Sequence, residues 1–112
     1  MNKDNAYIKD ILAMIEEIEN STAGFDYDDF IKNRTAYRAV ERNFEIIGEA
    51  VKRLSPEFTA TYPEIAWQDI AGFRDVLIHE YSGVNVATVW DTLQKDIPPL
   101  KVVLQKHKIT FK

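Results

Sequence analysis

Apolar residues recur with a helical period along most of this 112-residue chain. In residues 4–24 they stand three and four apart, the spacing of one helix face, with Asp4 as the expected N-cap and Gly24 as the stop. These apolar positions are Ile8, Ile11, Leu12, Ile15 and Ile18. The pair Asp26 and Asp29 then favours a short helix to about Asn33, although an ordered loop would fit the same residues.

The most regular pattern predicts a helix that is packed along its whole length. Apolar residues from Tyr37 to Leu54 step by three and four without interruption, which is the seam of a helix that contacts others throughout. A neighbouring row of mostly small residues indicates cover on a second side. Gly48 lies within this helix at a cost of about 1 kcal/mol relative to alanine, which suggests a close helix crossing there.

The second half of the chain is also predicted to be helical. Ser55-Pro56 is expected to end the long helix and can open a short turn, and residues 59–63 are expected to form a surface connection. The next helix is expected to run from about Trp67 through residues 74–81 to Gly83. Asn85 would then cap a helix whose inner face carries Val86, Val89, Trp90, Leu93 and Ile97.

Pro98-Pro99 lacks two backbone donors and should kink or restart that last helix, with the apolar face continuing to Leu104. No segment shows the strict alternation of a β-strand. We therefore predict an all-α, up-and-down bundle of four to five helices that forms a single domain over residues 1–112.

Composition limits the classes of function. The chain has no cysteine, which excludes disulfides and thiolate metal sites. It shows neither a signal peptide nor a membrane-spanning run, so we expect a cytoplasmic protein without a membrane partner. The net charge of −4 argues mildly against nucleic acid. However, positions 32–42 carry Lys32, Arg34, Arg38 and Arg42 against only Glu41. These basic residues could be an ordinary solvated helix face or could form a local basic surface.

The candidate chemistry is concentrated in residues 74–81, which contain Arg74, Asp75, His79 and Tyr81. On one helix, Arg74 and Tyr81 share a face, whereas His79 points about 140° away from Arg74. A straight helix therefore cannot bring Arg74 and His79 to the same phosphate. Either the helix breaks near His79, or the site is assembled from two chains.

Asp75 stands four residues before His79, so its carboxylate could fix the imidazole tautomer or could form an ordinary surface pair. Arg74 suits phosphate binding because its guanidinium is always charged and binds bidentately. His79 has no second histidine near it, and His107 lies between two lysines. We therefore expect no metal and no cofactor.

The pattern R-x-x-x-x-H-x-Y, formed by Arg74, His79 and Tyr81, resembles the signature of the HEPN superfamily, specifically the HepT-like toxins of HEPN/MNT toxin-antitoxin systems. The flanking residues 42–50, Trp67, Trp90 and Pro98-Pro99 are similar to that family too, so the resemblance covers nearly the whole chain.

This resemblance implies a HEPN-like bundle and a twofold homodimer whose paired motifs form a composite active site. It also implies metal-independent RNA cleavage, with Arg74 and His79 as catalytic residues and Asp75 in support. Tyr81 would accept AMP from a partner MNT nucleotidyltransferase, the antitoxin. Arg42 and Asn43 would lie near the active centre as supporting residues, although a buried Asn43 is more often a satisfied amide.

Two other functions remain open on the sequence. The chain could be a non-catalytic HEPN partner of a nucleotidyltransferase, or a nucleotide-binding module without cleavage. The acidic net charge and the lack of a recognisable aromatic and basic RNA platform keep both alternatives open. The complete motif, including Asp75, favours the ribonuclease.

Overall fold

The computed structural model describes residues 3–73 and 86–110, and in these ranges every regular element is a helix. The predicted all-α fold is confirmed. The helices are α1 (Asp4–Ser21), α2 (Tyr27–Lys32), α3 (Arg34–Lys52), α4 (Pro56–Thr61), α5 (Trp67–Ala71), α7 (Val86–Lys95) and α8 (Ile97–Thr110).

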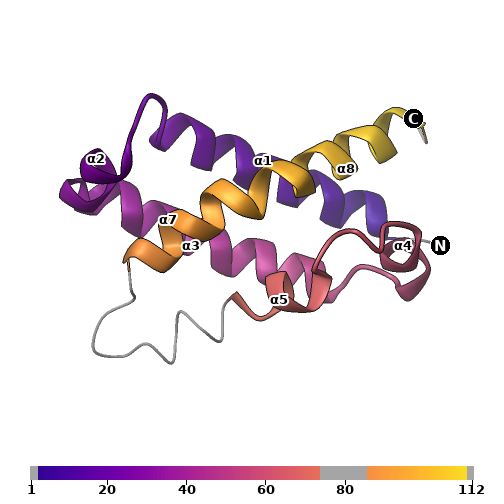
Figure 1. Ribbon diagram of the computed structural model, residues 1–112. Helices are drawn as coiled ribbons and strands as arrows, with labels where there is room; N and C mark the ends of the chain where they lie inside the picture. Colours follow the sequence, from indigo (N-terminus) through magenta and orange to yellow (C-terminus); the bar gives the residue numbers. More distant parts are fainter. Residues whose placement is uncertain (1–2, 74–85, 111–112) are drawn as a thin grey trace.

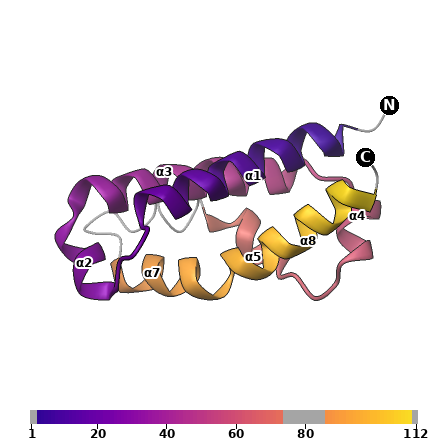
Figure 2. The same ribbon diagram turned by 90° about the horizontal axis from the view of Figure 1, so that it is seen from above.

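The long rods of the bundle are α1, α3, and α7 continued by α8. Helices α1 and α3 lie side by side, and α8 packs on α1 (Figure 1). Helix α1 runs to the end of the bundle that carries α2, and α3 returns antiparallel to it. Helices α7 and α8 then run in the direction of α3, as Figure 2 shows from above. Helix α5 packs on α3, and α2 contacts both α3 and α7. In this bundle α1 is therefore antiparallel both to α3 and to the α7–α8 rod, and the short helices lie at its ends and on its flank.

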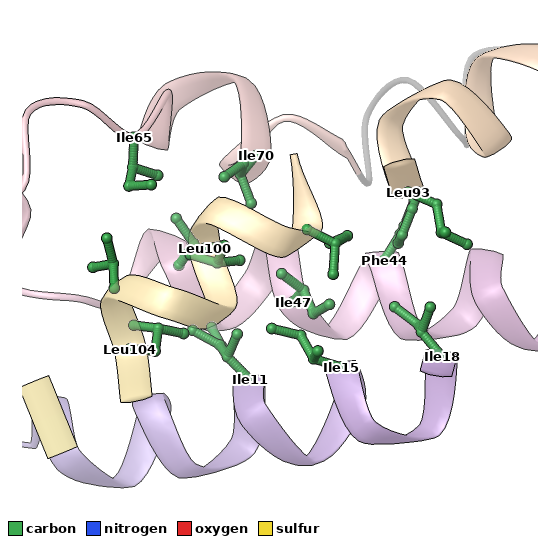
Figure 3. Packing of buried hydrophobic residues seen from close by; sticks show 14 of the residues in the cluster. Ile11, Ile15, Ile18, Phe44, Ile47, Ile65, Ile70, Leu93, Leu100 and Leu104 are labelled. Atoms are coloured by element: carbon green, nitrogen blue, oxygen red, sulfur yellow. The ribbon is translucent and has the colours of Figure 1, made fainter. Parts of the chain in front are cut away.

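The buried side chains form one continuous hydrophobic cluster between these rods (Figure 3). Both predicted apolar seams point into it, because most periodic positions of α1 and α3 are buried and the partly buried Leu12 and Tyr37 pack against the same cluster. The deepest side chains come from three rods and include Ile11, Ile15, Phe44, Ile47, Leu100 and Leu104. Gly48 is buried within α3, as expected for a position under a packed neighbour.

The capping and restart signals are mostly confirmed. Asp26 and Asp29 form a capping box at the start of α2, with each side chain accepting a hydrogen bond from the other residue's backbone N–H. Helix α7 ends at Lys95, and α8 restarts at Ile97. Pro98 and Pro99 thus occupy the first turn of α8, where no intrahelical N–H is needed.

The prediction that Asp4 caps α1 is wrong. Asp4 is the first residue of the helix, and the cap position, Lys3, makes no side-chain capping bond. The buried Asp4 carboxylate instead accepts hydrogen bonds from the Ser55 backbone N–H at 2.8 Å and from Ser55 Oγ at 2.6 Å. Ser55 Oγ in turn accepts from the Phe58 N–H, so Asp4 ties the start of α1 to the cap of α4.

Two predicted boundaries are also wrong. Part of the expected surface connection over residues 59–63 is helical, because Ser55 and Pro56 provide a cap and a first-turn proline for α4. The helix expected to run from Trp67 to Gly83 ends at Ala71, with Gly72 at its C-cap. The predicted stop at Gly83 and cap at Asn85 lie outside the described residues.

Candidate functional site

The residues predicted to carry the chemistry, Arg74, Asp75, His79 and Tyr81, lie in the stretch 74–85, outside the described residues. The structure does show how the chain is held on both sides of this stretch. The last described residue before it is Phe73, and the first after it is Val86. These two attachment points are the structural setting of the motif.

The attachment before the motif is an aromatic contact on α3. The Phe73 ring lies 5.1 Å from the ring of Phe44, at an interplanar angle of 34°. Phe44 is almost completely buried, and Phe73 is half-buried against the core. Because Phe73 directly precedes Arg74, this contact fixes the chain on α3 at the point where the motif begins.

Helix α5 supports that attachment. Trp67 Nε1–H donates to the Tyr62 carbonyl oxygen at 2.9 Å, and the Trp67 ring packs edge-on against Phe58 at 5.7 Å. Ile70 is buried in the core, and the Gly72 N–H closes the last turn by donating to α5 carbonyls. The path from α4 to Phe73 is thus held by both a hydrogen bond and core packing.

The attachment after the motif is the first turn of α7. Val89 is buried, and the Trp90 ring lies 5.1 Å from the buried ring of Phe30 on α2. The α7 end of the motif segment is therefore fixed at the α2 end of the bundle, on a different helix from Phe73.

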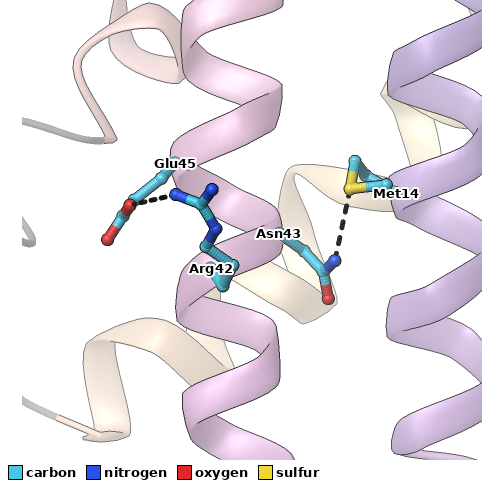
Figure 4. Close-up of polar contacts among 4 residues, drawn as sticks. All are labelled: Met14, Arg42, Asn43 and Glu45. Atoms are coloured by element: carbon cyan, nitrogen blue, oxygen red, sulfur yellow. Dashed lines mark hydrogen bonds and ion pairs between the residues drawn. The ribbon is translucent and has the colours of Figure 1, made fainter.

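Asn43, one of the two predicted supporting residues, lies between α3 and α1 (Figure 4). Its Nδ2 donates to Glu17 Oε1 at 3.2 Å and contacts Met14 Sδ at 3.4 Å. Its Oδ1 is buried and has no hydrogen-bond partner among the residues that the structure describes. Leaving such an acceptor unpaired costs about 1–3 kcal/mol, so Asn43 is a half-satisfied amide rather than the fully satisfied one expected.

Arg42, the other predicted supporting residue, points away from Asn43 (Figure 4). Its guanidinium is exposed and pairs with Glu45 at 3.1 Å. It borders a shallow groove between α1 and α3 that also receives Tyr7, Asp10 and Arg53. The structure therefore separates the two supporting candidates, with Asn43 in the interior and Arg42 in solvent.

Two carboxyl groups, Asp96 and Glu41, have a pKa above the ordinary value. Burial raises the pKa of Asp96, between α7 and α8, and the nearby Asp69 and Asp91 carboxylates raise it further. Burial also raises the pKa of Glu41 on α3, against the opposing effect of Arg38. In the described ranges, no group of three or more histidine or acidic residues is placed to hold a metal ion.

The placement of His107 was missed in the sequence, where it reads as part of a basic tail. In the structure its ring meets the ring of Phe58 edge-on at 4.7 Å, and its Nδ1 lies 3.1 Å from Tyr62 Oη. The sequence did contain a signal for this placement. His107 continues the three-and-four spacing of the apolar face of the last helix, whereas its position between two lysines suggested an exposed tail. His107 joins α8 to α4, at the opposite end of the bundle from α2 (Figure 1).

Comparison with known proteins gives a consistent result. The family model described as "Ribonuclease HepT-like" matches residues 11–107. A "Putative RNase" of Caldanaerobacter subterraneus is 43% identical, over 96% of this chain and 100% of its own length. A "Probable ribonuclease HepT" of Thermococcus cleftensis is 43% identical, over 89% of this chain and 91% of its own length.

A further "Putative RNase", from Methanocaldococcus jannaschii, is 43% identical over 90% of this chain and 87% of its own length. No solved structure matches the chain significantly. Among the described helices, none has the length and apolar character needed to cross a membrane.

Proposed function

We propose, from the premise that this chain belongs to the family of HepT-like ribonucleases, that it cleaves RNA without a metal ion, using Arg74 and His79. The observation that carries the proposal is the match of residues 11–107 to that family together with the complete Arg74, His79 and Tyr81 pattern. Relatives of nearly equal length that are named as ribonucleases support it.

In the proposed reaction, the ribose 2′-hydroxyl attacks the adjacent phosphorus as a base removes its proton. The bond from phosphorus to the 5′-oxygen breaks, an acid protonates that oxygen, and a 2′,3′-cyclic phosphate remains. Acid and base catalysis of this kind contributes typically ~10²–10⁴ in rate. Arg74 would stabilise the charge that builds on the phosphoryl oxygens.

We further propose that two chains form the active site as a homodimer. One chain supplies a single His79 and a single Arg74, at helical positions that diverge by about 140° on a straight helix. A twofold dimer supplies two of each, enough for one acid and one base. Light scattering at micromolar concentration tests this step, since a stable monomer would leave the site incomplete.

The biological role that fits this activity is that of a cytoplasmic toxin with a nucleotidyltransferase antitoxin. In the proposed off-switch, the Tyr81 hydroxyl attacks the α-phosphorus of ATP, and pyrophosphate leaves. The attached AMP adds bulk and negative charge two helical turns after Arg74, so it would compete with RNA phosphate for the guanidinium.

The test compares matched pairs of variants on a labelled single-stranded RNA. His79→Ala and Arg74→Ala should lose cleavage but stay folded by circular dichroism. His107→Ala, which removes the other histidine, and Arg53→Ala, which removes an exposed arginine paired with Glu49, should keep it. EDTA should have no effect, and DNA of the same sequence should be resistant.

Each alternative has its own result. Activity that is lost in EDTA and restored by a divalent ion would refute the metal-independent mechanism. An intact dimer that binds the nucleotidyltransferase but cleaves no RNA would support the second candidate, a non-catalytic HEPN partner or nucleotide-binding module. The net charge of −4 favours that candidate.

A further inference from the structure

Aromatic side chains from distant parts of the sequence meet where α2 contacts α7. The rings of Tyr27 and Trp90 lie 6.4 Å apart at 56°. Beneath them, the fully buried Phe30 packs against Trp90 at 5.1 Å and against Tyr37 at 6.3 Å. Tyr27 is 38% exposed, and Ile31, one turn along α2, is 41% exposed. The cluster therefore has a rigid floor and an exposed apolar edge.

Basic residues follow Ile31 directly in the sequence. Lys32 ends α2, Arg34 begins α3, and Arg38 lies about one turn further; all three are exposed. Lys32 and Arg34 form no ion pair with any residue in the described ranges. Elsewhere in these ranges, cations paired with carboxylates include Arg42, Arg53, Lys95 and Lys101. Within the described ranges, no ion pair neutralises Lys32 or Arg34, so their charge favours an anionic ligand.

Three carboxylates stand at the start of α2: Asp26 at its cap, and Asp28 and Asp29 in its first turn. Asp26 and Asp29 hold the start of the helix, where each accepts the other's backbone N–H at 2.8 and 3.1 Å. Lys32 and Arg34 stand at its far end and beyond. The exposed face thus changes from acidic to basic along α2, and a polyanion is favoured at the basic end.

We propose that Tyr27, Ile31 and Trp90 form a stacking platform for the bases of single-stranded RNA. In the same complex, Lys32, Arg34 and Arg38 bind the phosphates. The inference rests on the proposed ribonuclease function and adds a subsite to it. Stacking on aromatic rings next to a basic surface is how proteins bind single strands with little sequence preference. Trp90 lies one turn into α7, the first described helix after the motif in the sequence, so the platform includes a residue close to the motif along the chain.

Binding is measured in a His79→Ala, Trp67→Phe background, so that RNA survives and Trp90 is the single tryptophan. Phenylalanine at position 67 keeps a ring beside Phe58. A labelled oligoribonucleotide of 12 nucleotides should quench Trp90 fluorescence. Adding Tyr27→Leu should raise Kd about 5-fold to 150-fold, the equivalent of one lost base stack.

The cations are tested by salt dependence. Lys32→Gln with Arg34→Gln should reduce the slope of log K against log salt by about 1.4, which corresponds to two phosphate contacts on a single strand. The matched control is Lys9→Gln with Lys52→Gln, two exposed lysines. Lys9 lies in the first half of α1 and Lys52 is the last residue of α3, so both stand toward the helix ends away from α2. It removes the same charge and should leave the slope unchanged.

The outcomes separate this inference from the proposed function. If Tyr27→Leu leaves Kd unchanged while the unsubstituted protein cleaves RNA, the platform is refuted and the ribonuclease stands. If the protein cleaves no RNA but Tyr27→Leu still weakens binding, the ribonuclease fails and the platform stands. If Tyr27→Leu instead lowers the mass by light scattering, the face is an interface between copies of the chain, which refutes the RNA platform.

Discussion

Phe73 offers the sharpest test of how the bundle positions the motif. Its ring packs on Phe44 at 5.1 Å, and the next residue is Arg74. Phe73→Ala removes this contact without touching any proposed catalytic group. We expect a moderate loss of stability and a much larger loss of RNA cleavage.

The magnitude follows from burial. Replacing a fully buried phenylalanine with alanine costs about 3–5 kcal/mol, and Phe73 is only half-buried. The expected loss is therefore about 2 kcal/mol, or a fall in Tm of about 8 °C for a domain of this size. Displacing a catalytic group by about 1 Å can cost about 10²-fold in rate, so kcat/KM should fall by roughly that factor.

The assay is cleavage of a fluorogenic oligoribonucleotide at 20 °C, with the folded fraction checked by circular dichroism. Ile8→Val is the matched control. Ile8 is a buried core residue of α1, a helix that packs mainly on α3 and α8 rather than on α5. Its replacement should cost about 0.5–1.5 kcal/mol yet leave kcat/KM within about twofold.

Two results would refute this reasoning. If Phe73→Ala is destabilised but retains kcat/KM within about twofold, the contact with Phe44 does not position Arg74. If Ile8→Val loses as much activity as Phe73→Ala while folded, then the loss follows global stability and does not depend on the attachment point.

The remaining predictions concern a buried acid, a titration and the switch. Asp4→Ala should cost about 3 kcal/mol in urea unfolding, because it removes two charge-assisted bonds to Ser55, whereas Asp10→Ala, exposed on the same helix, should cost under about 0.5 kcal/mol. Burial raises the pKa of Asp96, so ionisation of this carboxyl destabilises the fold, and stability falls as pH rises through the raised pKa. Asp96→Asn should therefore raise Tm at about pH 7 but not at about pH 3. Tyr81→Phe should stay active but resist neutralisation by a cognate nucleotidyltransferase with ATP; adenylylation of undiminished yield, by mass spectrometry, would place the acceptor elsewhere.

Periodicity alone predicted the long helices α1 and α3. The three-and-four spacing of apolar residues in α1 and α3 is a local property of the sequence, and burial of those faces follows from it. The capping box at Asp26 and the restart at Pro98-Pro99 were predictable for the same reason: each depends on residues within one turn. The motif that defines the family is likewise read from spacing.

Tertiary structure decided what depends on residues far apart in the sequence. Asp4 has the chemistry of a helix cap, but Ser55, distant along the chain, competes for its carboxylate. Arg42 and Asn43 are neighbours in sequence that face solvent and core respectively. Tyr27 and Trp90 form one aromatic cluster only because α2 and α7 pack together. Long-range packing sets such contacts because the hydrophobic effect buries faces without regard to sequence distance.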